Sequence, residues 1–411
     1  MKIAGVDYRQ PKRFRSGTHR SRPPEQTLAE YVPLMPRFGI TRLANITGLD
    51  RIGLPVYTAI RPNSRSLSTS QGKGIDVASA KASALMESIE SWHAERVELP
   101  LRHDSYSTLR ASRAVLDIAR LAKYTNATTR PDVPMLWVEG YDLIRHEACW
   151  VPFEAVTNNF VMSPGSMSTS TFVEGTNGLA SGNHLLEAIE HGLCEVIERD
   201  AVRIADVRST AFSEATRLDL ASVRDPLCDE LVRMIQRAGL GVMVWDITSN
   251  IAVPTYRCSL FELEPQPQWR PMTRSGGFGC HLSPAVALMR ALTEAVQSRV
   301  TLIAGSRDDA FYEVYRSGSN EDDRSADLAR LAAPTPVQFA ARTARATDTF
   351  EDDVQILLDE LQAAGIAQAV VVDLTRPGIG IPVVKVVVPG LDSINESFVA
   401  LGERARAAKG T

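Results

Sequence analysis

The sequence predicts a mixed α/β (α+β) fold in which sheets pack on helices. Residues 225–260 and 351–388 each show an amphipathic helix that a glycine ends, then a strand, a turn and a second strand. The two copies suggest an internal pseudo-repeat but are too few for a repeat protein. β-Branched runs bounded by Gly and Pro at residues 38–49 and 52–62 predict further strands.

Composition favours a globular enzyme-sized chain and excludes several classes of protein. The chain has 411 residues, 44% of them hydrophobic and 23% charged, with a formal net charge of −4. This charge favours neither nucleic acid nor an anionic membrane as partner. No apolar run approaches the roughly 18 residues of a membrane span, and the N-terminus lacks a signal-peptide core. Five scattered cysteines without a CxxC pair indicate the reducing cytoplasm rather than disulfides or zinc.

The two ends of the chain differ in composition from the middle. Residues 1–25 form a basic N-terminal arm, with six basic side chains in residues 9–22 before Pro23 and Pro24. Such an arm is either solvated or folded over an anionic ligand, and charge alone does not decide. We expect residues 26–395 to form one domain and residues 396–411, which are basic, to be a flexible tail.

Three predicted helices each carry a narrow polar stripe on an otherwise apolar surface. The stripes consist of Ser83, Glu87 and Glu90; of Asn183, Glu187, Glu195 and Glu198; and of Arg290, Glu294 and Gln297. On the second helix these positions fall within about 120° of one another. A single stripe usually faces water. Three helices that are apolar on their remaining faces predict instead that the stripes line one polar cavity.

The shared cavity would gather several carboxylates. Like charges about 4 Å apart repel by about 4 kcal/mol at an effective dielectric of 20, so either the pKa values rise or cations neutralise the cluster. Oxygen ligands without His or Cys select Mg²⁺, which proteins usually share with substrate phosphates. Arg199 and Arg290 are then left to meet the phosphates. The residues around Gly72 do not match a Walker A loop, so we predict a Mg²⁺–nucleotide site of another kind.

These motifs resemble those of the YcaO family. The resemblance covers about residues 12–389, and it rests on three spaced motifs in the family's order. The motifs are Ser83-x3-Glu87-x2-Glu90, then Asn183-x3-Glu187 with Glu195-x2-Glu198-Arg199, and Arg290-x3-Glu294-x2-Gln297. One position departs from the pattern, because Ser91 follows Glu90 where the family usually has arginine.

The resemblance implies an α/β fold that binds ATP and Mg²⁺ and phosphorylates the oxygen of a peptide backbone amide. It places Mg²⁺ on Glu87, Glu90, Glu195 and Glu198. It implies that the nucleotide is contacted by Lys12, Ser83, Asn183, Glu187, Arg199, Arg290 and Gln297. Glu87, Glu198 and Arg290 are the residues we expect to be catalytic. The glycine-rich turn at residues 175–182 is predicted to let backbone approach the nucleotide.

The resemblance also bears on the product. Azoline-forming members often end in a proline-rich tail, whereas this chain ends in RARAAKGT. The N-terminal region resembles members that work with a TfuA-type partner and are tied to thioamide formation with a sulfur donor. We therefore expect thioamidation of a ribosomally made peptide or protein by a homodimer. The alternatives are an azoline-forming cyclodehydratase acting on Cys, Ser or Thr, and a non-catalytic nucleotide-binding scaffold.

Overall fold

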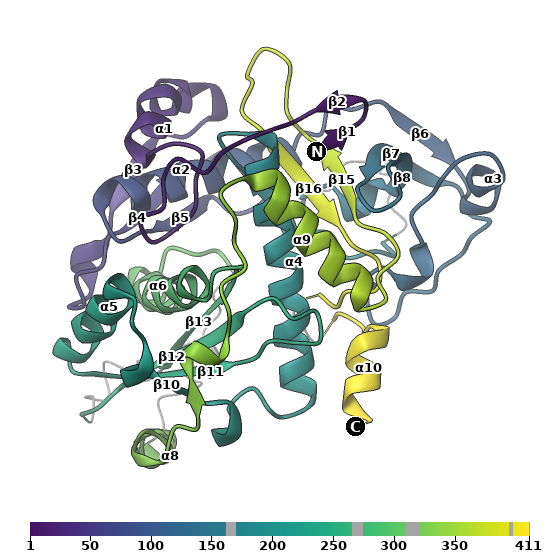
Figure 1. Ribbon diagram of the computed structural model, residues 1–411. Coiled ribbons are helices and arrows are strands. Elements are labelled where there is room, and N and C mark those ends of the chain that lie inside the picture. The colour runs from purple at the N-terminus through teal and green to yellow at the C-terminus, as the bar shows by residue number, and fades with distance from the viewer. Residues whose placement is uncertain (162–169, 265–273, 310–320, 394–397, 411) are drawn as a thin grey trace.

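The computed structural model describes residues 1–161, 170–264, 274–309, 321–393 and 398–410 (Figure 1). Within these ranges the main helices pack on two three-stranded antiparallel sheets and one six-stranded sheet. The predicted mixture of helices and sheets is therefore confirmed. None of the helices in this part of the chain is both long and apolar enough to cross a membrane.

The first unit is a three-stranded sheet with a helix packed on it. Its elements are β3 (Arg42–Asn45), β4 (Val56–Ile60), β5 (Thr69–Lys73) and α2 (Val77–Ala94), with α1 (Pro24–Tyr31) beside α2. Helix α2 begins at Asp76, whose side chain accepts a hydrogen bond from the Ser79 amide at 2.7 Å. Strand β5 contains Gly72, where a Cβ would lie 2.0 Å from the Ala84 nitrogen. This glycine lets α2 pack directly on the strand.

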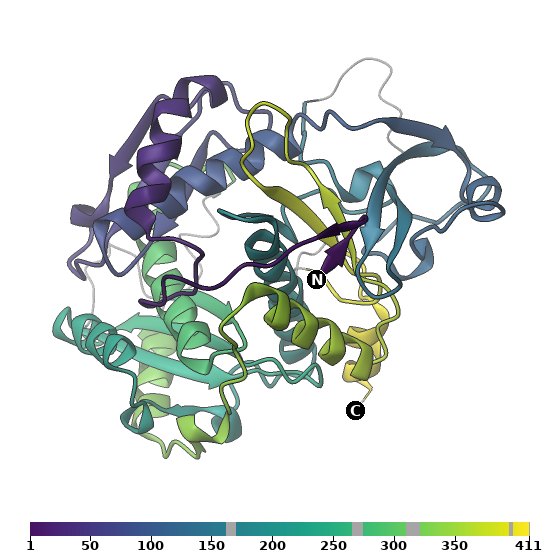
Figure 2. The same ribbon diagram turned by 45° about the horizontal axis from the view of Figure 1, so that its top comes forward.

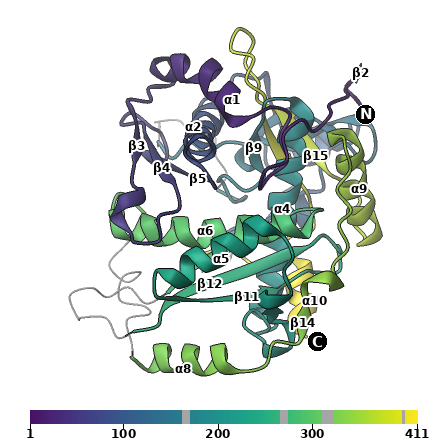
Figure 3. The same cartoon turned by 60° about the vertical axis from the view of Figure 1, so that its left-hand side comes forward.

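The second unit repeats this arrangement. Its elements are α5 (Pro226–Arg237), β11 (Leu240–Asp246), β12 (Thr255–Glu262), β13 (Arg274–Cys280) and α6 (Pro284–Ala304). Here Gly277 and Gly279 in β13 allow the close approach, because a Cβ on either would come within 2.2 Å of α6 backbone atoms. Figure 3 shows α6 lying between β5 of the first unit and α5 of the second.

The six-stranded sheet has the order β6-β7-β15-β16-β9, and β8 pairs with β7. Its strands are β6 (Leu101–Asp104), β7 (Met135–Asp142), β8 (Glu147–Pro152), β9 (Leu179–Ser181), β15 (Val370–Asp373) and β16 (Val383–Val387). The helices α4 (Leu185–Val207) and α9 (Phe350–Ala363) pack on one face through Val371, Val384 and Val386. Val370 and Val383 point into the core on the other face. This alternation is the period of two that a strand imposes.

Both copies of the internal repeat form the predicted elements. Residues 225–260 supply α5, β11 and β12, and residues 351–388 supply α9, β15 and β16. In each copy the two strands pair antiparallel, but the copies belong to different sheets. The remaining elements are β1 (Lys2–Ile3), β2 (Val6–Asp7), α3 (Tyr106–Arg110), β10 (Leu218–Asp219), α8 (Glu321–Ala332), β14 (Val337–Gln338) and α10 (Glu403–Lys409).

The two ends of the chain are packed onto the domain. The N-terminal arm crosses the molecule between β1–β2 and α1 (Figure 2) and pairs Pro11 with Thr349. The tail forms α10, which buries Ala405 and Ala408 and pairs Arg404 with Asp200 of α4 at 2.9 Å. A flexible tail is thus wrong for residues 403–409, because the two alanines give the basic helix a buried face. The predicted boundary at residues 395–396 lies outside the described residues.

Candidate functional site

Helix α4 runs through the centre of the molecule beside β16 (Figure 1). Two glycines allow this contact, because a Cβ on Gly178 would lie 2.2 Å from the Val386 oxygen and one on Gly192 2.7 Å from Val386 Cγ2. Gly182 likewise packs against the first turn of α4, with a Cβ position 2.8 Å from the Ala188 nitrogen. Gly178 and Gly182 of the predicted glycine-rich turn therefore serve packing within the protein.

The N-terminal end of α4 holds the basic arm. Glu187 accepts hydrogen bonds from the Ser21 amide at 3.0 Å and the Ser21 hydroxyl at 2.6 Å, and Arg20 lies 3.5 Å from the same carboxylate. Asn183 Oδ1 accepts from Arg22 Nε at 2.8 Å. Two residues predicted to contact nucleotide are thus joined to the arm, which folds over this end of the helix.

Two of the four predicted metal ligands come from α2. Glu90 accepts hydrogen bonds from the backbone amide of Ser181 at 2.8 Å and from its hydroxyl at 2.6 Å, and Ser181 ends β9 just before α4 begins. Glu87 is one turn away, and its residue is exposed to solvent. Burial nevertheless raises its pKa to about 7, with a further contribution from Glu195 of α4. Glu87 is therefore accessible to solvent and yet surrounded by enough protein to disfavour its charged form.

Helix α6 closes the site from a third side. Glu294 accepts a hydrogen bond from Lys73 Nζ of β5 at 2.9 Å and one from the Phe278 amide of β13 at 3.3 Å. Arg290 Nη2 lies 3.3 Å from His191 Nε2 of α4. Glutamates from all three predicted stripes therefore lie near one another, since Glu195 acts electrostatically on Glu87, and Glu294 on Glu198. Asn183 and Glu187 of the second stripe lie apart from them, at the N-terminal end of α4.

Burial disfavours the charged form of the carboxyl groups in this cluster. Burial raises the pKa of Glu198 to about 7 and that of Glu90 to about 8, and it also raises the pKa of Glu195. Repulsion from neighbouring carboxylates adds to each shift. Burial opposes ionisation of Glu294 as well, but Lys73 and Arg199 outweigh it and lower its pKa. At Glu87, Glu90 and Glu198, nearby positive charges and hydrogen bonds therefore do not offset the effect of burial on the pKa.

The arrangement fits Mg²⁺ shared with phosphates. Glu198 Oε2 is buried and has no hydrogen-bond partner among the described residues. Among those residues, no three of the glutamates bring ligand oxygens within 4.8 Å of one another. Mg²⁺ does not require such a group of three, because it is usually held by one or two carboxylates together with substrate phosphates. Arg290 Nε is also buried without a partner in this part of the chain, so a donor remains for an anion.

Lys12 lies in a separate polar cluster. Its fully buried ammonium pairs with Asp353 of α9 and lies 3.7 Å from Glu190 of α4. Together with Asp353, His19 and His281 form the one group of described residues with the spacing of a metal site. However, His281 Nδ1 accepts from the Ser283 amide at 2.9 Å, so the neutral ring carries its proton on Nε2. Since Lys12 already supplies the positive charge, we assign no metal here.

The remaining site residues divide into predicted and missed ones. Ser83, Gln297 and Arg199 are partly buried on α2, α6 and α4, and Arg199 lies 3.9 Å from Glu195. Lys73 and Ser181, which hold Glu294 and Glu90, were missed by sequence reasoning. Lys73 is 221 positions from Glu294, and no local pattern reports such a pairing. For Glu294 itself, the sequence did offer a signal, namely its position in the third polar stripe.

Comparisons with known proteins agree with the geometry. A family model of YcaO cyclodehydratases, described as ATP- and Mg²⁺-binding, matches residues 71–392. The protein of the tfuA 3′ region of Rhizobium leguminosarum bv. trifolii is 36% identical over 397 residues, which cover 93% of this chain and 91% of that protein.

Two solved structures share the fold. The structure of YcaO from Methanopyrus kandleri bound with AMPPCP and Mg²⁺ has a TM-score of 0.72 and 23% identity, and the match covers 96% of this chain and 99% of that one. A heterocyclase in complex with substrate and cofactor has a TM-score of 0.77 and 23% identity. That match covers 94% of this chain and 54% of the heterocyclase, which is the longer protein.

Proposed function

Because this chain belongs to the YcaO family, which binds ATP and Mg²⁺, we propose that it activates a backbone amide of a peptide or protein for conversion to a thioamide. The observation that carries the proposal is the cluster of carboxylates on α2 and α4. Glu87, Glu90 and Glu198 have raised pKa values, and Arg199 and Arg290, which can bind phosphates, lie near Glu198. This combination of cation demand and anion donors is what a Mg²⁺–nucleotide requires.

In the proposed reaction, Mg²⁺–ATP supplies the phosphoryl group that makes the amide oxygen a leaving group. Overall, the amide, hydrosulfide and ATP give the thioamide, ADP and inorganic phosphate, so the amide oxygen leaves in the phosphate. The proton of hydrosulfide leaves with the phosphate as well. Glu87, Glu90, Glu195 and Glu198 hold the cations, and Arg199 and Arg290 bind the phosphates. Catalysis rests on positioning and charge neutralisation, as in phosphoryl transfer generally.

The thioamide product is favoured by one relative. The 36% identical relative comes from the tfuA 3′ region, which supports a TfuA-type partner for this chain as well. We retain the predicted homodimer, which analytical ultracentrifugation tests.

The direct test combines the protein with ATP, Mg²⁺, sulfide and short peptides encoded beside its gene, with and without the TfuA-type protein. We expect phosphate release and peptides in which sulfur replaces oxygen, detected by mass spectrometry. The proposal would be contradicted if the peptides stay unmodified and their addition does not increase phosphate release.

The second candidate is azoline formation, which the description of the family model as a cyclodehydratase favours. In that case a peptide containing Cys, Ser or Thr loses water in the same assay, and sulfide has no effect. A scaffold role would show in variants: Glu87→Ala and Glu198→Ala would then leave modification by a partner enzyme intact.

A further inference from the structure

A cavity of about 220 Å³ adjoins the metal-binding half of the site. Glu195 and Arg199 of α4 contribute one wall, residues 385–388 of β16 and the segment after it a second, and residues 173–177 a third. The cavity therefore borders a predicted Mg²⁺ ligand and a predicted phosphate-binding arginine without being part of the cluster itself.

The cavity's position along α4 separates it from the other end of the nucleotide site. Asn183 and Glu187 lie at the N-terminal end of the helix, and Arg199 lies about 18 Å farther along, given a rise of 1.5 Å per residue. The cavity touches the helix only at residues 195, 196 and 199. Since Mg²⁺ is shared with phosphates, this is the end at which the transferable phosphoryl group would lie.

Two polar side chains in the cavity wall form fewer hydrogen bonds than they can. Lys385 is 3% exposed, and among the described residues its ammonium has one hydrogen-bond partner, the Gly175 carbonyl. An ammonium has three N–H donors, so donors remain. Asn177 Oδ1 is buried and has no partner in the described part of the chain. Burial lowers the pKa of Lys385 to about 8, so the side chain carries its charge at neutral pH.

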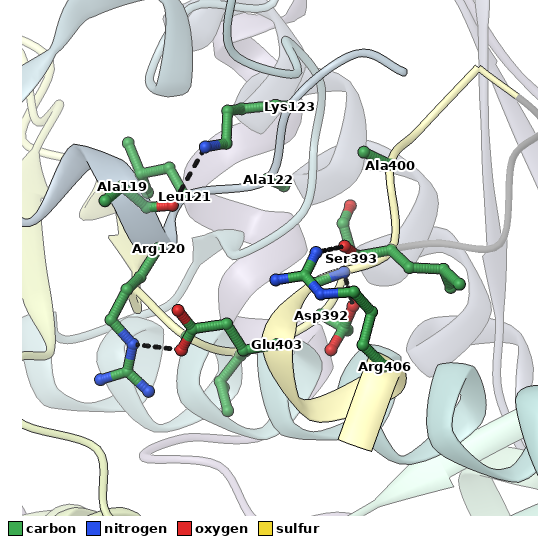
Figure 4. Close-up of a pocket in the computed structure, with 14 residues that line it drawn as sticks. Ala119, Arg120, Leu121, Ala122, Lys123, Asp392, Ser393, Ala400, Glu403 and Arg406 are labelled. Atoms are coloured by element: carbon green, nitrogen blue, oxygen red, sulfur yellow. Dashed lines mark hydrogen bonds and ion pairs between the residues drawn. The ribbon is translucent and has the colours of Figure 1, made fainter. Parts of the chain in front are cut away.

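The wall also contains apolar residues, among them Val196, Val386 and Val387, and the cavity adjoins a second hollow. Leu121, Ala122, Leu391 and Ser393 line both. Figure 4 shows the second hollow between residues 119–123 and the C-terminal segment, where Arg120 pairs with Glu403 at 3.1 Å. Two adjacent hollows suit an extended chain better than a small ion such as hydrosulfide.

We propose that the cavity binds the peptide segment whose amide is activated, with Lys385 donating to a backbone carbonyl and Asn177 Oδ1 accepting from a backbone N–H. An amide bond presents one acceptor and one donor, which matches the free donor and free acceptor in the wall. The apolar residues around them accept varied side chains. This inference rests on the proposed function, because it names where that function's substrate lies.

The first test compares Lys385→Met, Lys385→Arg and Asn177→Leu with the exposed control Lys409→Met. We expect Lys385→Met and Asn177→Leu to raise the KM for the peptide about tenfold or more, because each removes a buried hydrogen bond to substrate. Lys385→Arg should restore most of the loss. The Kd for AMPPCP with Mg²⁺, measured by calorimetry, should change less than threefold in each variant. An unchanged KM, or a KM effect matched by the nucleotide Kd, would overturn the inference while leaving the proposed function standing.

The second test does not depend on turnover. Crystals of the protein with AMPPCP and Mg²⁺ are soaked with N-acetylglycylglycine amide, a minimal backbone probe. We expect density for the probe in the cavity against Lys385 and Asn177, and its absence after Lys385→Met. A probe bound only elsewhere, or not bound, contradicts the inference. Failure of the proposed function shows separately, as wild-type protein that modifies no peptide although it binds the probe.

Discussion

The two ends of α4 treat their carboxylates differently. At the N-terminal end, Glu187 receives hydrogen bonds from Ser21 and lies within ion-pair distance of Arg20. In the C-terminal half, Glu198 has a buried oxygen without a partner among the described residues, and its pKa is raised to about 7. Both residues are 2% exposed. Burial alone therefore does not distinguish a structural carboxylate from one that requires a ligand.

The two ends differ in how the negative charge is neutralised. At one end the protein supplies the positive group, and at the other we expect a bound cation to do so. The arm closes the first end through contacts within the chain. The second end lies near Glu87, Glu90 and Glu195, and repulsion from neighbouring carboxylates raises the pKa of each of them. Neutralisation there has to come from bound Mg²⁺ or from protons.

The largest effect is expected at the second end. Glu198→Gln should lower Mg²⁺-dependent phosphate release at least about 100-fold, because it removes a carboxylate from the cation site. The free protein should be no less stable, since the variant removes a buried charge. Phosphate release and thermal unfolding are measured beside the exposed control Glu139→Gln. A change of less than threefold in Glu198→Gln would remove Glu198 from the site.

The next effect concerns the packing of α6 on β13, which places α6 beside the C-terminal half of α4. Gly277→Ala puts a Cβ 2.2 Å from the Ala295 nitrogen, so we expect a loss of about 1–3 kcal/mol or more in unfolding free energy. Because α6 carries Arg290 and Glu294, AMPPCP binding should weaken too. The neighbouring variant Gly276→Ala is the control, since its Cβ position meets nothing closer than 3.6 Å. Equal denaturation midpoints for the two variants would contradict the close packing.

The pH dependence sharpens the comparison further. Glu87, Glu90 and Glu198 have pKa values of about 7, 8 and 7 in the folded protein, above the ordinary value of 4.5. Their contribution to stability is full below about pH 4.5 and is lost as the pH rises through 7 to 8. The Mg²⁺–AMPPCP complex replaces the protons, so its increase in Tm should be larger at pH 8 than at pH 6. A thermal shift that is equal at both pH values would show that the carboxylates do not bind the cation.

The smallest effect is expected at the first end. Ser21→Ala removes a hydroxyl that donates to Glu187, which should cost about 1 kcal/mol of unfolding free energy and speed proteolysis of the arm. The control is Ser107→Ala, which removes an exposed hydrogen bond to Asp132. If both variants unfold at the same denaturant concentration, the arm is not held by Glu187.

Much of the site was predictable because it is periodic. The stripes on α2, α4 and α6 follow from helical spacing, and the residue that caps α2 is Asp76, a residue type that favours this position. The helix–strand–strand repeat was readable for the same reason. These features depend on neighbours within a few residues, so the order of residues alone reports them.

The rest depends on contacts between distant segments. The pairs Lys73–Glu294 and Ser21–Glu187 join residues that are 221 and 166 positions apart. Gly178 is a packing residue because β16, far along the chain, lies against it. The tail becomes a helix because Ala405 and Ala408 find a surface on the domain. Neither composition nor local sequence pattern predicts contacts of this kind.

The central claim is that the second end of α4 binds a nucleotide through Mg²⁺. Isothermal titration calorimetry of the protein with AMPPCP, with and without Mg²⁺, tests it most directly. We predict saturable heat that requires Mg²⁺ and that Glu198→Gln abolishes, while Glu139→Gln retains it. No saturable heat in the wild-type protein, or equal heat without Mg²⁺, would contradict the claim.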